Sequence, residues 1–246
     1  DITGARTVIS ELADEVVADL LLINDHDLTY GKIRFDERSI KTLKTHLGDI
    51  TDSLTRALCW SAAWDMHRDG ELSATDYTEI VLNALGKESE ASVINAQLTN
   101  LETAVEIYSS PNNREKLRAR RSSGLYQLAT AAKAGSDEQL ALVKGFAAGA
   151  TKADAPKIKE ILDGKLAGVT VDTEMRWSLI KALTEHGIYG QNEIDAELKR
   201  DNTADGVRHG AEARAMIATA ENKAAIWLEL TTTKLSNHIQ RHILMG

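Results

Sequence analysis

A run of basic side chains at helical spacing could bind an anionic group. Arg114, Arg118 and Arg121 stand at positions i, i+4 and i+7, so they share one face of any helix that contains them. Such a face can capture an anionic group, for example a peptide carboxylate or a phosphate, through charge-assisted hydrogen bonds. A solvated helix face explains the same spacing, because charged side chains mostly lie at the surface. The whole basic run comprises Arg114, Lys116, Arg118, Arg120 and Arg121, offset only by Glu115.

Two histidines near the end of the sequence have the spacing of zinc ligands on one helix face, His238 and His242. The zincin motif requires a glutamate directly after the first histidine, and Ile239 occupies that position. No third ligand can be named from the sequence. A surface pair or a partner-facing pair is therefore the preferred interpretation, and a metal site is the alternative.

Other residues that could do chemistry have simpler explanations. The four tryptophans could stack on bases or sugars, but their apolar neighbours favour core packing. The carboxylates around an early turn lack the spacing of a calcium loop, and turn formation explains them. Cys59 lies in an apolar stretch without a cationic neighbour, which favours an inert buried thiol. These tryptophans are Trp60, Trp64, Trp177 and Trp227, and the carboxylates are Asp25, Asp27, Asp36 and Glu37.

Charge and composition argue against several classes of function. The net charge of −8 disfavours general attraction to nucleic acid. The single cysteine excludes an internal disulfide and a cysteine-based zinc site, and it suits a reducing, cytoplasmic location. No apolar run has the length of a membrane-spanning helix, and no glycine-rich nucleotide loop or nucleophile elbow occurs. The residues alone therefore describe a scaffold with no catalytic residue and no metal ligand.

The elements that would position these residues are mostly helices. Only two prolines occur among 246 residues, and Ala, Leu, Glu and Lys are abundant, which predicts a mainly helical chain. Before the helices, residues 19–24 and 32–35 have the apolar and alternating patterns of short strands. Two strands are not stable alone. We therefore expect residues 1–37 to be the end of a β domain and residues 38–246 to form a helical domain.

Regular spacing of the helix starts predicts the architecture of the helical part. Successive helix pairs start about 33 to 48 residues apart, as helical-hairpin repeats do. This predicts an irregular superhelix of antiparallel helix pairs, of the HEAT or armadillo type, preceded by a short β segment. A closed helical bundle is the alternative. The pairs start near Asp52, Ser89, Asp137, Asp172 and Asp205, and other candidate caps are Ser73, Ser136, Asn192, Thr203 and Thr219.

Five stretches, in order along the chain, resemble the aminopeptidase N family of the actinobacterial type. The first is similar to the end of that family's β-sandwich domain, and the others are similar to its helical C-terminal domain. This resemblance covers nearly the whole chain. The stretches are Leu20–Arg34, Arg56–Met66, Glu174–Trp177, Ile194–Leu198 and Thr219–Trp227.

The resemblance implies a zinc-dependent aminopeptidase of the gluzincin type, a hydrolase whose catalytic domain carries G-x-M-E-N, H-E-x-x-H and a distal glutamate. This sequence contains neither of the two motifs. No catalytic or metal role can therefore be carried over, and we expect this segment to be inactive alone. The zinc would belong to a catalytic domain outside it. The family's chains also continue beyond the equivalent of Gly246, so we expect the segment to be truncated.

In that family the helical domain closes a chamber over the catalytic domain and can contact the far end of the peptide. The expected partners are therefore the chain's own catalytic and β domains and a peptide substrate. Within this interpretation, Arg118 and Arg121 are the candidate ligands for the peptide's C-terminal carboxylate. A free-standing helical-repeat scaffold that binds a protein or peptide is the alternative function.

Overall fold

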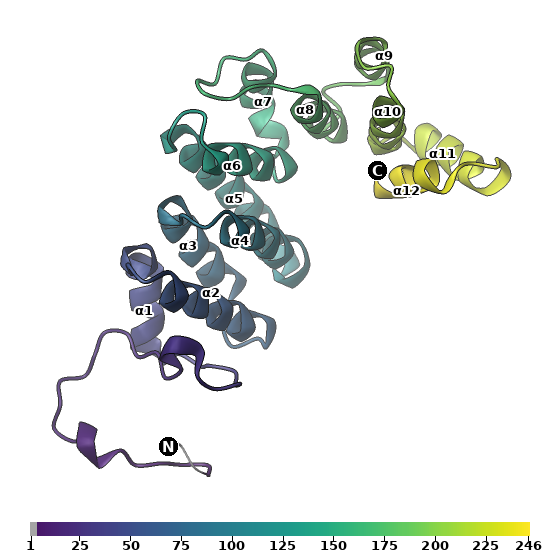
Figure 1. The fold of residues 1–246 in the computed structure, drawn as a ribbon. Coiled ribbons are helices and arrows are strands. Elements are labelled where there is room, and N and C mark those ends of the chain that lie inside the picture. The colour runs from purple at the N-terminus through teal and green to yellow at the C-terminus, as the bar shows by residue number, and fades with distance from the viewer. Residues whose placement is uncertain (1–3) are drawn as a thin grey trace.

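Helices make up the architecture. The structure is a computed structural model that describes residues 4–246, and within them it contains twelve α-helices and no β-strand (Figure 1). The prediction of a mostly helical chain is confirmed. The helices are α1 (Glu37–His46), α2 (Ser53–Arg68), α3 (Ala74–Ala84), α4 (Ala91–Thr103), α5 (Pro111–Ala131), α6 (Asp137–Ala148), α7 (Ala155–Leu162), α8 (Thr173–Glu185), α9 (Gln191–Arg200), α10 (Ala204–Met216), α11 (Ala220–Thr232) and α12 (Asn237–Met245).

Shorter helical turns connect several of these helices. Helix α4 continues directly into a π-helical turn, η5 (Ala104–Tyr108), which ends two residues before Ser110, the residue that precedes α5. A π-turn is rare and often marks a functional site. The 3₁₀ turns are η1 (Ser10–Leu12), η2 (Asp25–Asp27), η3 (Leu47–Asp49), η4 (Leu85–Lys87) and η6 (Lys152–Asp154).

Side-chain caps explain where many helices begin. The Ser73 hydroxyl accepts the Asp76 N–H at 3.0 Å, and the Ser136 hydroxyl accepts the Gln139 N–H at 3.1 Å, as the sequence predicts. The predicted cap at Asn192 is wrong. Helix α9 begins after Gly190, whose N–H donates to the Glu193 carboxylate at 2.8 Å. Asn192 therefore lies inside the first turn.

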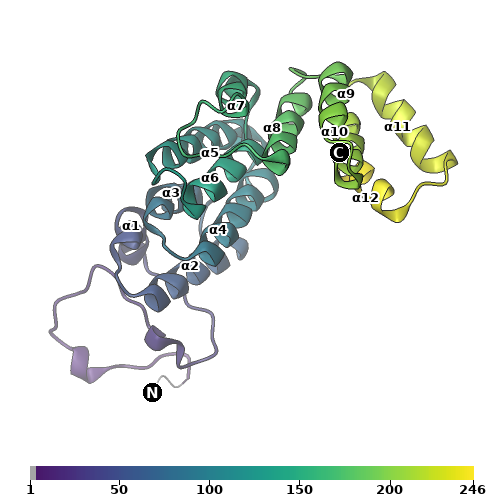
Figure 2. The ribbon, with the colours of Figure 1, turned by 45° about the horizontal axis from the view of Figure 1, so that its top comes forward.

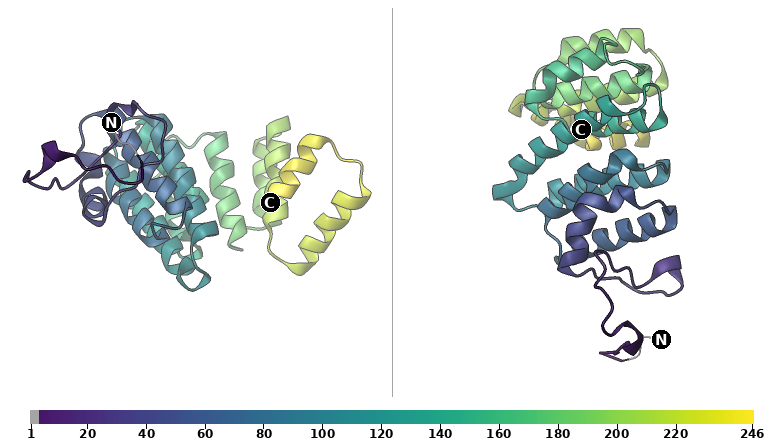
Figure 3. Two further views of the ribbon diagram at one scale, coloured as in Figure 1. Left: turned by 90° about the horizontal axis from the view of Figure 1, so that it is seen from below. Right: turned by 90° about the vertical axis from the view of Figure 1, so that its left-hand side faces the viewer.

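The helices stack in chain order along a curved array (Figure 1). Helices α1 to α7 form one stack, and α9 to α12 form a group beyond α8, as Figure 2 shows. The N-terminal segment reaches away from the helices at the opposite end from the last helix (Figure 3). An open superhelix is therefore observed, and the closed bundle is not.

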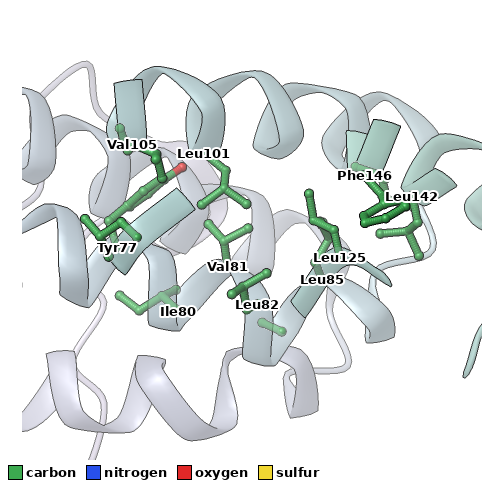
Figure 4. Packing of buried hydrophobic residues seen from close by; sticks show 14 of the residues in the cluster. Tyr77, Ile80, Val81, Leu82, Leu85, Leu101, Val105, Leu125, Leu142 and Phe146 are labelled. Carbon is green, nitrogen blue, oxygen red and sulfur yellow. The ribbon is translucent and has the colours of Figure 1, made fainter. Parts of the chain in front are cut away.

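The core is aliphatic with a few large rings. Tyr77, Leu101, Leu125 and Phe146 are almost completely buried in one cluster that extends from α1 to α8 (Figure 4). Two smaller clusters continue it, one around Trp177 and one around Ile243. Each buried side chain of this size contributes roughly 1.5–3 kcal/mol relative to exposure. Helix α8 belongs to the large cluster on one face and to the Trp177 cluster on the other.

The two predicted strands are wrong, because neither of their segments has a strand to pair with in the described part of the chain. The Phe35 N–H contacts Met66 Sδ at 3.3 Å, and the Leu21 N–H donates to the Ser39 hydroxyl at 3.0 Å. The alternation before Phe35 has another cause, since Ile33 and Phe35 are buried in the helical core. The division into residues 1–37 and 38–246 stays a prediction.

Candidate functional site

A large cavity lies among the helices on either side of α8. Its volume is about 820 Å³, and its walls come from α4, η5, α5, α6, α8 and α10. Most of its charged side chains come from positions that the sequence did not single out. Both basic residues predicted to bind substrate, Arg118 and Arg121, lie in its wall. The structure therefore brings these two residues together at one cavity.

Arg118 is held by two carboxylates. Its Nε donates to Glu106 Oε2 at 3.0 Å, and its Nη1 donates to Glu115 Oε1 at 2.6 Å. A further contact joins its Nη2 to Glu106. The hydrogen bonds that Arg118 donates to Glu106 raise the pKa of Arg118, so this guanidinium stays charged. Its donors at Nε and both terminal nitrogens are already engaged.

Arg121 differs from Arg118 because most of its donors are free. Its side chain is only 6% exposed, and its Nη2 contacts Glu106 Oε1 at 3.0 Å and donates to the Gly149 carbonyl at 3.2 Å. Its Nε and Nη1 are buried and have no hydrogen-bond partner within residues 4–246. Three of the five N–H donors of this arginine are therefore unused. A buried donor without a partner costs about 1–3 kcal/mol, which a ligand acceptor would relieve.

The guanidinium of Arg121 lies directly against Gly149. A Cβ atom at position 149 would lie 2.6 Å from Arg121 Nε and 2.9 Å from its Cζ. A larger residue at this position would force the guanidinium to shift. Gly149 follows α6, so the end of that helix fixes where the guanidinium sits.

Glu106 is the carboxylate that joins the two arginines. It comes from the π-turn η5, and its side chain is 29% exposed. Burial raises the pKa of Glu106, but the hydrogen bond from Arg118 and the charge of Arg121 outweigh it and hold the pKa below its ordinary value. Glu106 is therefore ionised and forms an internal anion in the cavity wall.

A second, smaller cavity adjoins the first at Arg121. Its volume is about 230 Å³, and Leu98, Leu125 and Ala141 give it an apolar lining. Lys144 lines both cavities and takes part in no ion pair among the described residues. An apolar recess beside Lys144 and the partly engaged Arg121 is suited to a ligand that carries both an anion and an apolar group.

The opposite wall of the large cavity carries a neutralised carboxylate. Lys181 Nζ donates to Glu212 Oε1 at 2.8 Å, and His242 Nδ1 lies 2.9 Å from Glu212 Oε2. Burial raises the pKa of Glu212, but the hydrogen bonds from Lys181 and His242 outweigh it and keep the pKa low. Lys181 is therefore already engaged by Glu212, whereas Arg121 keeps unused N–H donors.

The histidine pair does not form a metal site with its surroundings. His238 is exposed, and His242 contacts Glu212. Within residues 4–246, no three His, Cys, Asp or Glu side chains come together as metal ligands would. The described residues around the histidine pair therefore do not form a zinc site.

The remaining residues with expected roles are mostly structural. Trp60 donates to Glu88 at 3.1 Å and Trp177 donates to Asp201 at 2.8 Å, both inside the core. Trp227 is 67% exposed, so the prediction that it packs in the core is wrong. Burial raises the pKa of the Cys59 thiol to about 12, as expected for an inert cysteine.

The acidic residues near the N-terminus also have structural partners. Asp36 caps α1 by accepting the Ser39 N–H at 2.7 Å, and this hydrogen bond lowers the pKa of Asp36. Asp25 accepts a hydrogen bond from the Thr55 hydroxyl at 3.1 Å.

Arg114, the first of the basic triplet, donates to the Ser109 carbonyl at 3.0 Å.

Three cavity residues were missed by sequence reasoning: Glu106, Lys144 and Glu212. Each comes from a different element, and no local motif relates them to the arginines.

In the described part of the chain, no helix is both long and apolar enough to cross a membrane.

Comparison with known proteins identifies the family. The chain belongs to the ERAP1-like C-terminal domain family, whose profile matches residues 20–246. It is also similar to the aminopeptidase N of Streptomyces lividans, with 41% identity over 250 residues. The match covers 100% of this chain and 29% of that protein, so the chain spans less than a third of the length of its relative. The predicted resemblance to aminopeptidase N is confirmed.

Proposed function

We propose that this chain is the non-catalytic C-terminal region of a zinc-dependent aminopeptidase that removes N-terminal residues from peptides. The observation that carries the proposal is the 41% identity to aminopeptidase N along the entire chain. The family profile supports it, because it describes a C-terminal domain. Zinc would be held by a catalytic domain elsewhere in the polypeptide, since the described residues offer no ligand cluster.

In this proposal the superhelix forms part of the wall of a peptide chamber. The curved stack of helices and the cavity of about 820 Å³ support that role. Arg118 and Arg121 attract the C-terminal carboxylate of the peptide. Arg121 is the stronger candidate of the two, because its Nε and Nη1 donors are free while the nitrogens of Arg118 are engaged.

The partners in the proposal are the catalytic and β domains of the same polypeptide. Large apolar side chains before α1 are strongly exposed, among them Val16 at 93% and Leu28 at 84%. Exposed apolar side chains gathered in one segment support a contact surface for another domain. The buried, single Cys59 supports a reducing, cytoplasmic location.

A first experiment separates a non-catalytic region from an enzyme. The purified chain is assayed with leucine p-nitroanilide, with and without added zinc, and its metal content is measured. No turnover and no stoichiometric zinc are expected. Chelator-sensitive hydrolysis by this chain would contradict the proposal.

A second experiment tests the role in peptide binding. In the longer polypeptide, replacing Arg118 and Arg121 together by alanine is expected to raise KM for long peptides more than for single-residue reporters. Equal effects on both substrates would count against the carboxylate role. A coding sequence with no metallopeptidase before Asp1 would instead favour the peptide-binding scaffold.

A further inference from the structure

Glu106 sits where a bound carboxylate would be expected. Its two oxygens take the Nε of Arg118 at 3.1 and 3.0 Å and the Nη2 of Arg121 at 3.0 Å. Planar, charge-assisted contact of this kind is how arginine recognises a ligand carboxylate. The Glu106 carboxylate thus binds the two arginines in the way that the carboxylate of a ligand would.

We propose that Glu106 is a built-in occupant of this anion site, and that a ligand carboxylate binds by replacing it at Arg121 with help from Lys144. The inference rests on the proposed role of Arg121 in binding the peptide carboxylate. It adds a competitor, Glu106, and a second receptor group, Lys144.

The contacts around Glu106 make the exchange feasible. Glu106 is 29% exposed at the cavity, whereas Arg121 is 6% exposed, so the carboxylate is the more accessible partner. When Glu106 leaves, Arg118 keeps its 2.6 Å contact with Glu115. Releasing Glu106 therefore leaves neither arginine without a nearby acceptor, because Arg121 also keeps the Gly149 carbonyl.

Arg121 and Lys144 together have more hydrogen-bond donors than Glu106 engages. Nε and Nη1 of Arg121 have no partner among the described residues even when Glu106 is in place. Lys144 lines both cavities beside Arg121 and is also unpaired. Both nitrogens of Arg121 are closed to solvent in this structure, and its Nε lies against Gly149, so a ligand reaches them only when Glu106 moves aside and the guanidinium shifts. It then makes contacts that Glu106 does not make, which favours exchange over simple exclusion.

Glu102 provides a matched control within the same wall. It lines both cavities, as Arg121 and Lys144 do, but it forms no ion pair within residues 4–246. Glu102→Gln and Glu106→Gln each remove one negative charge from the cavity. Only the second variant removes the competitor at the arginines, so the pair separates general electrostatics from exchange.

The test measures binding of an N-acetylated tripeptide that ends in leucine, as the free acid and as the C-terminal amide, by titration calorimetry of the 246-residue chain. Glu106→Gln is expected to raise the affinity for the acid about tenfold, the size of one charge-assisted contact, and to leave the amide unchanged. Glu102→Gln is expected to raise the affinity for the acid less than about threefold, because its effect is screened. Lys144→Gln is expected to lower it severalfold.

Each other outcome has a distinct meaning. Equal gains from Glu106→Gln and Glu102→Gln overturn the inference, since charge alone then suffices. Weaker acid binding in Glu106→Gln overturns it too, because Glu106 then serves to position the arginines. Wild-type preference for acid over amide tests the proposed carboxylate role separately. If that preference is absent in wild type and appears in Glu106→Gln, exchange is supported and the proposed role of the native site fails.

A further variant guards against a folding defect. Glu106→Asp keeps the charge and shortens the side chain by one methylene, so it is expected to bind the acid with an affinity between wild type and Glu106→Gln. Thermal melting of every variant checks that the fold is retained. If Glu106→Gln does not fold, an affinity of Glu106→Asp equal to that of wild type overturns the inference.

Discussion

Two arginine–glutamate pairs in this chain have opposite characters. Arg56 in α2 is saturated: its Nη2 and Nε donate to Glu88 at 2.9 and 3.3 Å, and its Nη1 donates to the Ile50 carbonyl at 2.8 Å. Glu88 also accepts from Trp60 at 3.1 Å. Arg121, equally buried, leaves its Nε and Nη1 unpaired. Burial alone therefore does not define an arginine's role. Unused donors beside a cavity distinguish a receptor arginine from a structural one.

The largest expected effect comes from breaking the saturated pair. Arg56→Ala leaves Glu88 as an unpaired charge in the core, which is expected to lower the free energy of unfolding by about 3–5 kcal/mol. Urea denaturation followed by circular dichroism measures it. Arg120→Ala, at an exposed position, is the control and is expected to change stability by less than about 0.5 kcal/mol. A loss below about 1 kcal/mol for Arg56→Ala would remove the basis of the comparison.

His67 in the core also has a buried nitrogen without a partner, as Arg121 does at the cavity, but His67 can change its protonation state, so we expect its contribution to stability to depend on pH. His67 is buried, its Nδ1 donates to the Leu72 carbonyl at 2.9 Å, and its Nε2 has no partner among residues 4–246. Burial lowers the pKa of His67 below its ordinary value. The unfolded chain therefore binds a proton at a higher pH than the folded chain does. Stability contributed by His67 is present above the unfolded pKa and is lost as the pH falls through it.

The expected slope is at most about 1.4 kcal/mol per pH unit between about pH 6.5 and the folded pKa. Urea denaturation of wild type and His67→Phe at several pH values from 7 to 5 measures it. The phenylalanine keeps a ring stacked on Tyr77, whose centroid lies 5.1 Å from that of His67. Parallel stability curves for the two proteins would show that His67 does not titrate as its burial predicts.

Gly149→Ala, which crowds Arg121, is expected to lower the free energy of unfolding less than Arg56→Ala does. Gly149→Ala places a methyl group against the Arg121 guanidinium and forces that side chain to shift. Because the far part of a flexible side chain can move, the loss is expected to be about 1 kcal/mol. Affinity for the acetylated tripeptide acid is expected to fall severalfold in the same variant. Unchanged affinity would mean that the position of Arg121 does not matter for binding.

The smallest effect is expected from removing the receptor arginine itself. Arg121→Met takes away unpaired donors and keeps the packing volume, while Arg118 still pairs with Glu106. Stability is expected to change by less than about 1 kcal/mol, because apolar replacement of imperfectly paired charges is often neutral. Urea denaturation beside Arg56→Ala gives the contrast directly. A loss as large as that of Arg56→Ala would make Arg121 structural.

Local signals predicted much of the helical architecture. Capping serines at 73 and 136 and capping aspartates at 52 and 172 start helices where the sequence places them. These signals act within a few residues, so they can be read without knowing the fold. The strand prediction before Phe35 failed because four alternating residues also fit an extended segment lying against a helix.

The site was only partly predictable for a related reason. Spacing placed Arg118 and Arg121 on one face, but the state of each depends on groups far away in sequence. Gly149, 28 positions after Arg121, determines how closely the chain can approach its guanidinium. Glu106 reaches both arginines from a π-turn that no sequence pattern announced. Exposure of Trp227 was missed because apolar neighbours in sequence do not guarantee neighbours in space.

Helix α11 is expected to unfold locally before the core helices do. It has no fully buried side chain, and Trp227 and Leu228 are both more than 60% exposed. In a linear array each repeat is stabilised by its neighbours, so weakly covered elements open first. Amide hydrogens of α11 should therefore exchange with deuterium far sooner than those of α3, whose Tyr77, Ile80 and Val81 are completely enclosed.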